Sequence, residues 1–276
     1  MSSQLFVNYW IGQEPNPPSP TLDQMPAYVD IVPLAFVGID DNYELSFGFL
    51  TQHFPAPQIQ GWIKTIQANG TKVLLSINDQ KLGAIPADRQ EAFIANVVAS
   101  VAEWGVDGLD FDYEPPVAST TLVPLIGALR EALPAGSVFT APVYSSWLGN
   151  HDLLGELAGA VDWITTMDYT PYPGFGETIA LCETYAKAIG GWSKLLIGMS
   201  CMGPSDGGNF TPLADVKRLS AYVPASGEAK GGAMLYTFSY DVTTRNNGTT
   251  GTGYPDGTWT ETIHALLPAT AEAALA

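Results

Sequence analysis

The segment Asp107-Gly-Leu-Asp110-Phe-Asp112-Tyr-Glu114 carries the residues best suited to chemistry in this chain. Residues two apart in a β-strand point to the same side, so Asp110, Asp112 and Glu114 share one face and the apolar residues between them share the other. Three carboxyl groups this close together cannot all ionise in a low-dielectric site. Such a row is typical of a site that holds a proton near neutral pH.

Two other roles fit this row of acids less well. A solvated edge strand could carry alternating acids, but aligning three of them is costly. Metal binding would require further ligands, and one strand alone makes a poor cage. The three histidines are scattered and typical of surface or loop positions: His53, His151 and His264. We therefore expect no metal and no cofactor.

Strand-like and helix-like segments alternate along the whole chain. Near-continuous apolar runs, typical of strands covered on both faces, predict strands at Leu5–Trp10, Ile31–Val37, Lys72–Asn78, Gly108–Glu114, Val138–Val143, Trp163–Tyr169, Lys194–Met199 and Gly232–Ser239. Apolar residues at helical spacing predict helices at Ala56–Ala68, Ala87–Trp104, Thr121–Ala132, Asp152–Ala160, Glu177–Ile189, Leu213–Tyr222 and Thr258–Leu267.

Eight strands separated by helices predict either a closed (β/α)8 TIM barrel or a large doubly wound sheet. Such a sheet usually has a glycine-rich phosphate turn after its first strand, and none follows Trp10, so the barrel is favoured. One barrel domain would span residues 1–276, with Asn246–Gly257 as a long loop and Pro268–Ala276 as a fraying helix. The acids would then line the interior and rise toward the C-terminal face, where barrel enzymes place their sites.

Charge and hydropathy exclude several classes of partner. The net charge of −17, with 11 Lys plus Arg, argues against nucleic acid and against anionic membrane surfaces. The longest apolar runs, such as Val73–Ile77, are too short to cross a bilayer. We expect a monomer whose two cysteines, Cys182 and Cys201, are more often free than paired.

The acidic segment resembles the DGxDxDxE signature of glycoside hydrolase family 18, the chitinases and related endo-N-acetylglucosaminidases. Other segments resemble strands of this family in the same order: Val7-Asn-Tyr9-Trp10 the first, Leu34-Ala-Phe36 the second, Lys72-Val-Leu-Leu-Ser76 the third, Met167-Asp-Tyr169 the sixth and Gly232-Ala-Met-Leu-Tyr236 the eighth. The resemblance spans the chain and implies a single (β/α)8 barrel. The stretch from Gly203 to Gly231 is too short for the insertion domain of many members, which predicts an open cleft suited to internal cuts.

The resemblance implies retaining, substrate-assisted hydrolysis of β-1,4 bonds next to N-acetylglucosamine, an exception to the scheme with two catalytic carboxylates. Glu114 would act as acid and then as base, while the 2-acetamido group of the substrate attacks the anomeric carbon. Asp112 would orient that group, Asp110 would share a proton with Asp112, and Tyr169 would bind the acetamido oxygen. Expected sugar-binding residues are Tyr9, Phe36, Met167, Tyr236 and, in a flanking subsite, Trp147; Asp168 points away and is expected to form a structural pair.

Three positions depart from the family pattern. Ile77-Asn78-Asp79 follows Ser76 where Ser-x-Gly-Gly is usual, Thr170 follows Tyr169 where an acid or amide is usual, and Tyr236 replaces a tryptophan. An endo-acting chitinase is the first expectation; the alternatives are an endo-β-N-acetylglucosaminidase cleaving the chitobiose core of N-glycans and a catalytically silent chitin-binding lectin. The partner would be chitin, a chitooligosaccharide or an N-glycan. We expect an extracellular, secreted protein although no signal peptide precedes Gln4; export by another route and an intracellular location also fit.

Overall fold

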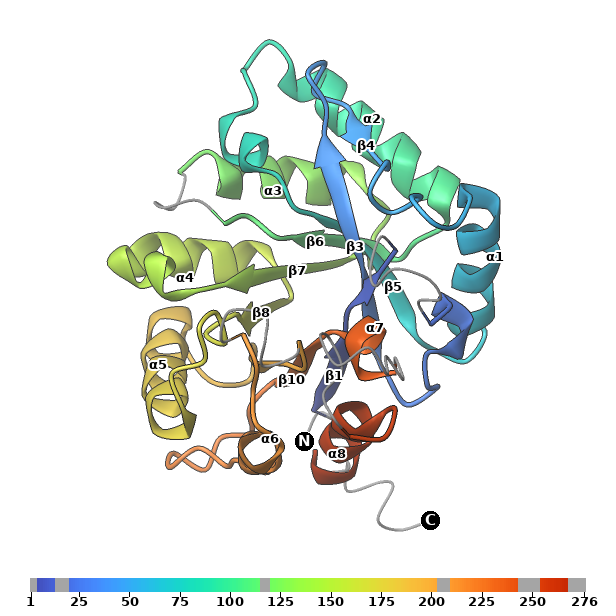
Figure 1. Ribbon diagram of the computed structural model, residues 1–276. Coiled ribbons are helices and arrows are strands. Elements are labelled where there is room, and N and C mark those ends of the chain that lie inside the picture. Colours follow the sequence, from blue (N-terminus) through green and yellow to red (C-terminus); the bar gives the residue numbers. More distant parts are fainter. Residues whose placement is uncertain (1–3, 13–19, 115–119, 203–208, 243–253, 268–276) are drawn as a thin grey trace.

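The computed structural model describes residues 4–12, 20–114, 120–202, 209–242 and 254–267, which form a closed parallel barrel surrounded by helices (Figure 1). The strands are β1 Leu5–Asn8 with its continuation β2 Trp10–Ile11, β3 Ile31–Ile39, β5 Lys72–Ile77, β6 Gly108–Phe111, β7 Val138–Val143, β8 Trp163–Thr166, β9 Leu195–Ser200 and β10 Gly232–Tyr236. Sequential neighbours pair in parallel, and β1 pairs with both β10 and β3, which closes the ring. The predicted (β/α)8 barrel is confirmed.

Helices cover the outside of this ring. They are α1 Ala56–Gln67, α2 Gln90–Trp104, α3 Leu122–Ala132, α4 His151–Ala160, α5 Phe175–Ile189, α6 Leu213–Ser220, α7 Phe238–Asp241 and α8 Thr258–Leu266, with 3-10 turns η1 Leu22–Gln24, η2 Gln80–Ala84 and η3 Ser145–Gly149. The short β4, Leu45–Ser46, pairs antiparallel with β3. The described residues between β9 and β10 contain α6 and no inserted domain.

Local chemistry explains where several elements end. Gly105 and Gly190 adopt left-handed conformations (φ 65° and 87°) and stop α2 and α5, as their positions in the sequence indicate. The predicted strand to Ser239 is wrong at its end: β10 stops at Tyr236, and the Thr237 side chain accepts a hydrogen bond from the Ser239 backbone, which caps α7. The predicted fraying helix and most of the predicted loop at 246–257 lie outside the described residues.

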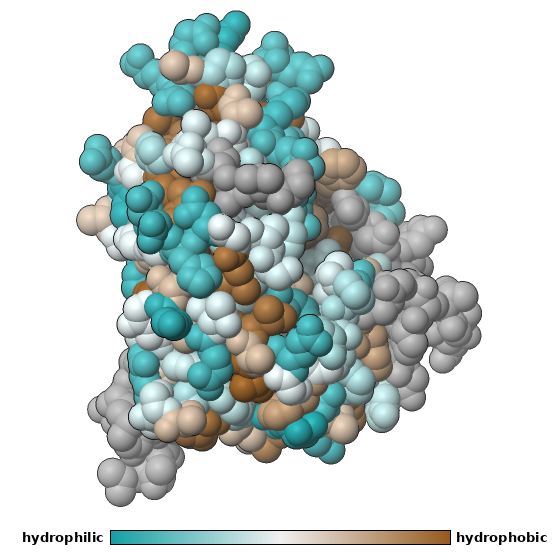
Figure 2. Space-filling model, turned by 90° about the vertical axis from the view of Figure 1, so that its left-hand side faces the viewer, coloured by the Kyte–Doolittle hydropathy of each residue, from teal (hydrophilic) through white to brown (hydrophobic). Residues whose placement is uncertain are grey.

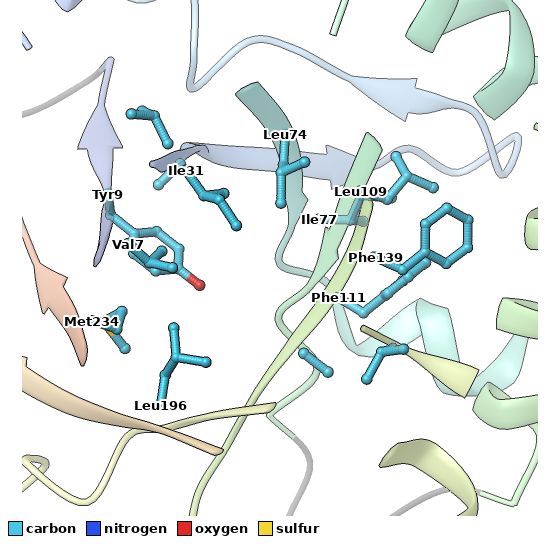
Figure 3. Packing of buried hydrophobic residues seen from close by; sticks show 14 of the residues in the cluster. Val7, Tyr9, Ile31, Leu74, Ile77, Leu109, Phe111, Phe139, Leu196 and Met234 are labelled. Atoms are coloured by element: carbon cyan, nitrogen blue, oxygen red, sulfur yellow. The ribbon is translucent and has the colours of Figure 1, made fainter. Parts of the chain in front are cut away.

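Apolar side chains fill the inside of the barrel and the space under the helices. Figure 3 shows Val7, Leu74, Leu196 and Met234 pointing into the space enclosed by the strands. Leu109, Phe111 and Phe139 lie on the opposite side of β6 and β7 (Figure 3). On that outer side the two phenyl rings meet edge to face at 5.4 Å between centroids. The strands are therefore buried on both faces, as their continuous apolar sequences require.

Hydrophilic side chains are the more widespread kind on the face of the molecule that Figure 2 shows. Figure 2 shows the face that carries α4 and α5, where hydrophilic side chains are spread widely and apolar side chains form separate areas. Among the described residues, no helix combines the length and apolar character needed to cross a membrane. Cys182 and Cys201 are both buried free thiols.

Candidate active site

The carboxylate row begins inside the barrel and continues beyond the end of its strand. β6 ends at Phe111, earlier than the predicted end at Glu114. The backbone N–H of Asp112 still donates to the Ile77 carbonyl at 3.1 Å, which extends the pairing with β5 by one residue. The side chains of Asp112 and Glu114 therefore point to the face that strand spacing predicts, although regular strand hydrogen bonding does not continue to Glu114.

Asp110 forms the base of the row and is fully buried. Its Oδ2 accepts hydrogen bonds from the Tyr9 hydroxyl at 2.8 Å and from Ser76 Oγ at 2.7 Å, while Oδ1 accepts from Thr140 Oγ1. Burial raises the pKa of Asp110, and the three hydroxyl donors act against this by stabilising the carboxylate. Hydroxyls from three different staves of the barrel, β5, β7 and the junction of β1 with β2, thus anchor one carboxyl group.

Asp112 lies next in the row and is 4% exposed. Burial raises its pKa well above the usual value, the charges of Glu114 and Asp110 raise it further, and a hydrogen bond from Asn78 lowers it. Asp112 Oδ1 has no hydrogen-bond partner among the described residues. Burial and the two neighbouring charges therefore favour the protonated form of Asp112.

A pocket of about 400 Å³ opens above the row. Seven of the residues predicted for the site line it together: Tyr9, Phe36, Asp112, Glu114, Met167, Tyr169 and Tyr236. Glu114 is exposed to this space, whereas Asp110 lies beneath it. The pocket is therefore at the C-terminal end of the strands, where barrel enzymes carry their sites.

Aromatic rings form one wall of the pocket around Tyr236. The Tyr236 ring lies 6.2 Å from Tyr169 at an interplanar angle of 13° and 6.3 Å from Phe36 at 25°. Tyr9 meets it edge-on at 5.8 Å. Burial raises the phenol pKa of both Tyr9 and Tyr169 well above the usual value, so both hydroxyls stay protonated and can donate hydrogen bonds.

Sequence reasoning missed five residues of the pocket. These are Asn78, Tyr144, Thr170, Met202 and Asn209. Asn78 and Thr170 depart from the family pattern, but the departure alone predicts no role for them in the site. Tyr144 directly follows β7, and Met202 comes two residues after the end of β9, so a position just after a predicted strand is a signal for both.

The structure corrects the proposed subsite role of Trp147. This residue lies in η3 and is 1% exposed, and its indole meets the ring of Tyr113 at 6.4 Å between centroids. Tyr113 belongs to the apolar side of the carboxylate segment, so the indole contacts the side opposite the acids. It does not line the pocket, and it offers no stacking face to a sugar in this conformation.

Asp168 lies away from the acids and pairs with a helix, as expected for a structural residue. Its Oδ1 accepts a hydrogen bond from the Tyr185 hydroxyl of α5 at 3.2 Å. Burial raises its pKa to about 7. Within the described part of the chain, no group of three or more His, Cys, Asp or Glu side chains is arranged to hold a metal ion.

Solved structures similar to this fold include several sugar-cleaving enzymes. A GH18 chitinase from Pseudoalteromonas aurantia superposes with a TM-score of 0.74 at 18% identity, covering 96% of this chain and 100% of that one. A fungal endo-beta-N-acetylglucosaminidase of glycosyl hydrolase family 18 gives 0.74 at 14% identity, covering 95% and 98%. An Ostrinia furnacalis chitinase catalytic domain in complex with penta-N-acetylchitooctaose gives 0.68 at 15% identity, covering 96% of each chain. At these identities the similarity shows the fold.

The sequence itself identifies the family. No curated protein matches the chain significantly. The family profile described as Glycosyl hydrolases family 18 matches residues 5–205, which include every strand from β1 to β9 and the whole acidic segment. The match covers well over half of the chain and agrees with the fold of the similar structures. The chain belongs to glycosyl hydrolases family 18, and the protein is a glycoside hydrolase.

Proposed function

We propose that this hydrolase cleaves β-1,4 bonds next to N-acetylglucosamine with retention, using the acetamido group of the substrate as nucleophile. The observation that carries the proposal is the row of three acids under the pocket, with Asp110 anchored, Asp112 buried and Glu114 exposed. Both Asp112 and Glu114 line the space where a glycosidic oxygen would lie, and Glu114 is the exposed one of the two. An arrangement with one exposed acid suits chemistry in which the substrate supplies the second group.

Each step of this reaction has a residue suited to it. Glu114 gives its proton to the glycosidic oxygen, the bond from that oxygen to the anomeric carbon breaks, and the acetamido oxygen bonds to the same carbon. Asp112, once its proton has passed to Asp110, accepts the acetamido N–H, and its charge balances the positive charge of the oxazolinium ion, while the Tyr169 hydroxyl donates to the acetamido group. Water then attacks the anomeric carbon as the bond from that carbon to the acetamido oxygen breaks, and the water gives a proton to Glu114, which restores the enzyme and leaves the β configuration in the product.

Chitin-type oligomers are the proposed substrates. Tyr9, Phe36 and Tyr236 provide apolar surface for an N-acetylglucosamine ring, and the chain has no inserted domain in the described residues between β9 and β10 to close the cleft. Both chitinases named above share this fold, and one of them is in complex with a chitooligosaccharide. An open cleft over a linear polymer favours internal cuts.

Cleavage of the N-glycan core is the second candidate, and two observations favour it. Tyr236 stands where chitinases usually have tryptophan, and Trp147 is buried, which removes one predicted platform for a longer sugar chain. A similar structure is also an endo-beta-N-acetylglucosaminidase. Fewer aromatic side chains for stacking sugars suit an N-glycan, which is cut at a single bond in its core, better than a long chitin chain.

Product analysis on both substrates distinguishes the candidates. The protein is incubated with chitotetraose and, separately, with a high-mannose glycoprotein, and the products are followed by mass spectrometry and early proton NMR. We expect chitobiose with the β anomer formed first. Release of intact glycans with chitotetraose left uncut would support the second candidate, and α product first would contradict the mechanism.

A further inference from the structure

Asn78 follows directly after β5 and contacts two acids of the row. Its Nδ2 lies 2.8 Å from Asp112 Oδ2 and 3.2 Å from Glu114 Oε1. An amide nitrogen carries two hydrogens, so it can donate one to each carboxyl group. The opposite amide orientation would place Oδ1 against both carboxyl oxygens, and the contacts therefore fix the orientation with nitrogen toward the acids.

The backbone around Asn78 is held on both sides. Its own N–H donates to the Val37 carbonyl at 3.0 Å, which ties it to β3. The next residue, Asp79, accepts the backbone N–H of Ile39 at 2.9 Å and caps η2. The amide is thus presented to the acids from a fixed position at the end of two strands, as a positioning group requires.

The charges around Asp112 make this contact important. The ionisable groups facing Asp112 are Asp110 and Glu114 from its own segment, Tyr9 after β1 and Tyr169 after β8. The two acids raise its pKa, as does burial, and the hydrogen bond from Asn78 is the influence that lowers it. Without the amide, nothing among these groups would favour the charged form of Asp112.

We propose that Asn78 is a positioning residue of this hydrolase, whose amide joins Asp112 to Glu114 and keeps the two carboxyl groups in one mutual orientation through the reaction. The role of Asn78 in catalysis rests on the proposed function. Its effect on the ionisation of Asp112 does not depend on that function. The family usually has glycine at this part of the third strand, and glycine supplies no side-chain donor. Asn78 therefore gives this chain a side-chain donor that influences the protonation of Asp112 and Glu114.

The first test measures the acids directly and needs no substrate. Carboxyl ¹³C NMR follows the titration of Asp112 in the native protein, in Asn78→Ala and in Asn78→Asp, with Asp112→Asn used to assign the signal. The titration midpoint should move to higher pH in Asn78→Ala, which loses the donor, and further in Asn78→Asp, which adds a like charge. Asn78→Asp keeps the side-chain shape, so it carries the test if Asn78→Ala does not fold.

Asp79→Asn is the matched control, because it changes the neighbouring residue outside the pocket. Its Asp112 titration should equal that of the native protein. Unchanged midpoints in both Asn78 variants, or an equal shift in Asp79→Asn, would overturn the inference.

The second test is the pH dependence of hydrolysis. Asn78→Ala should lower kcat roughly 10- to 100-fold, the expected effect of losing hydrogen bonds to charged groups, with KM changed less than about threefold. The acidic limb of the profile should move to higher pH. A lower kcat at every pH with the limb unmoved would mean a purely structural role and would overturn the inference. Failure of the proposed function appears separately, as absence of hydrolysis by the native protein while the NMR shifts remain.

Discussion

At the scale of single residues, Glu114 has the clearest expected role. It is the exposed acid of the row, and Asn78 is positioned to hold its carboxyl group. Glu114→Gln keeps the size of the side chain and removes the transferable proton. We expect hydrolysis to fall ~10²-fold or more while oligosaccharide binding, measured by calorimetry, persists. A variant that retains more than about a tenth of the native rate would show that another group is the acid.

Tyr236 is the residue that separates the two candidate substrates. Its ring is nearly parallel to that of Tyr169, and it faces the pocket. Tyr236→Trp enlarges the stacking face and removes the hydroxyl. For a chitinase, kcat/KM on chitotetraose should stay the same or rise. If the hydroxyl instead binds a glycan, release of glycans should weaken by the ~1–3 kcal/mol that an unsatisfied buried partner costs.

The sequence predicted the acids of the site better than it predicted the residues around them. Strand spacing placed Asp110, Asp112 and Glu114 on one face, because that periodicity is a local property of the backbone. Trp147 was assigned wrongly because a 3-10 turn decides whether an indole faces the pocket or the core, and its sequence carries no periodicity. The contact of Asn78 with the row depends on how β5 and β6 are placed side by side, which no single segment reveals.

At the scale of elements, Lys230 is a buried lysine that binds the C-terminal end of helix α6. It is 1% exposed, and its Nζ donates to the carbonyls of Ser220 at 2.8 Å and Tyr222 at 3.0 Å, where α6 ends. The partial negative charge of a helix C-terminus stabilises a cation there. No carboxylate pairs with it among the described residues, and burial lowers its pKa from 10.5 to about 8.

This lysine predicts a pH-dependent contribution to stability. Between the folded pKa of about 8 and the unfolded value of 10.5, the unfolded chain binds more protons, so its contribution to the free energy of unfolding rises with pH. Lys230→Met lacks this rise. In urea unfolding, the native protein should gain about 2 kcal/mol relative to the variant between pH 7 and pH 9.5. A constant difference across this range would show that Lys230 does not titrate as described.

Element types were predictable here, and their ends were less so. The spacing of apolar residues located all seven predicted helices, because each must bury one face against the barrel. The additional helix α7 was missed because it has only one turn, Phe238–Asp241, and its apolar residues continue the pattern of β10. Its start depends on the Thr237 cap, and a threonine alone is equally common within strands.

At the scale of the whole molecule, the balance of charge is the dominant feature. The chain has 28 acidic and 11 basic side chains, and the four ion pairs found among the described residues all join partly exposed groups. Exposed pairs contribute at most ~1 kcal/mol each. The net charge of −17 is therefore left largely uncompensated, and repulsion among the acids disfavours the compact state.

Added salt should consequently stabilise this protein at neutral pH. Raising NaCl from about 10 to 150 mM shortens the screening length from about 30 to 8 Å, which weakens repulsion between distant acids more than attraction within close pairs. We expect the Tm at pH 7 to rise by about 2–4 °C, the effect of ~1 kcal/mol in a chain of this size. The same series near the pI of about 4.2 is the control, because there the net charge approaches zero. The rise should disappear at that pH; an equal rise at both pH values would mean that salt acts on apolar burial rather than on the acidic surface.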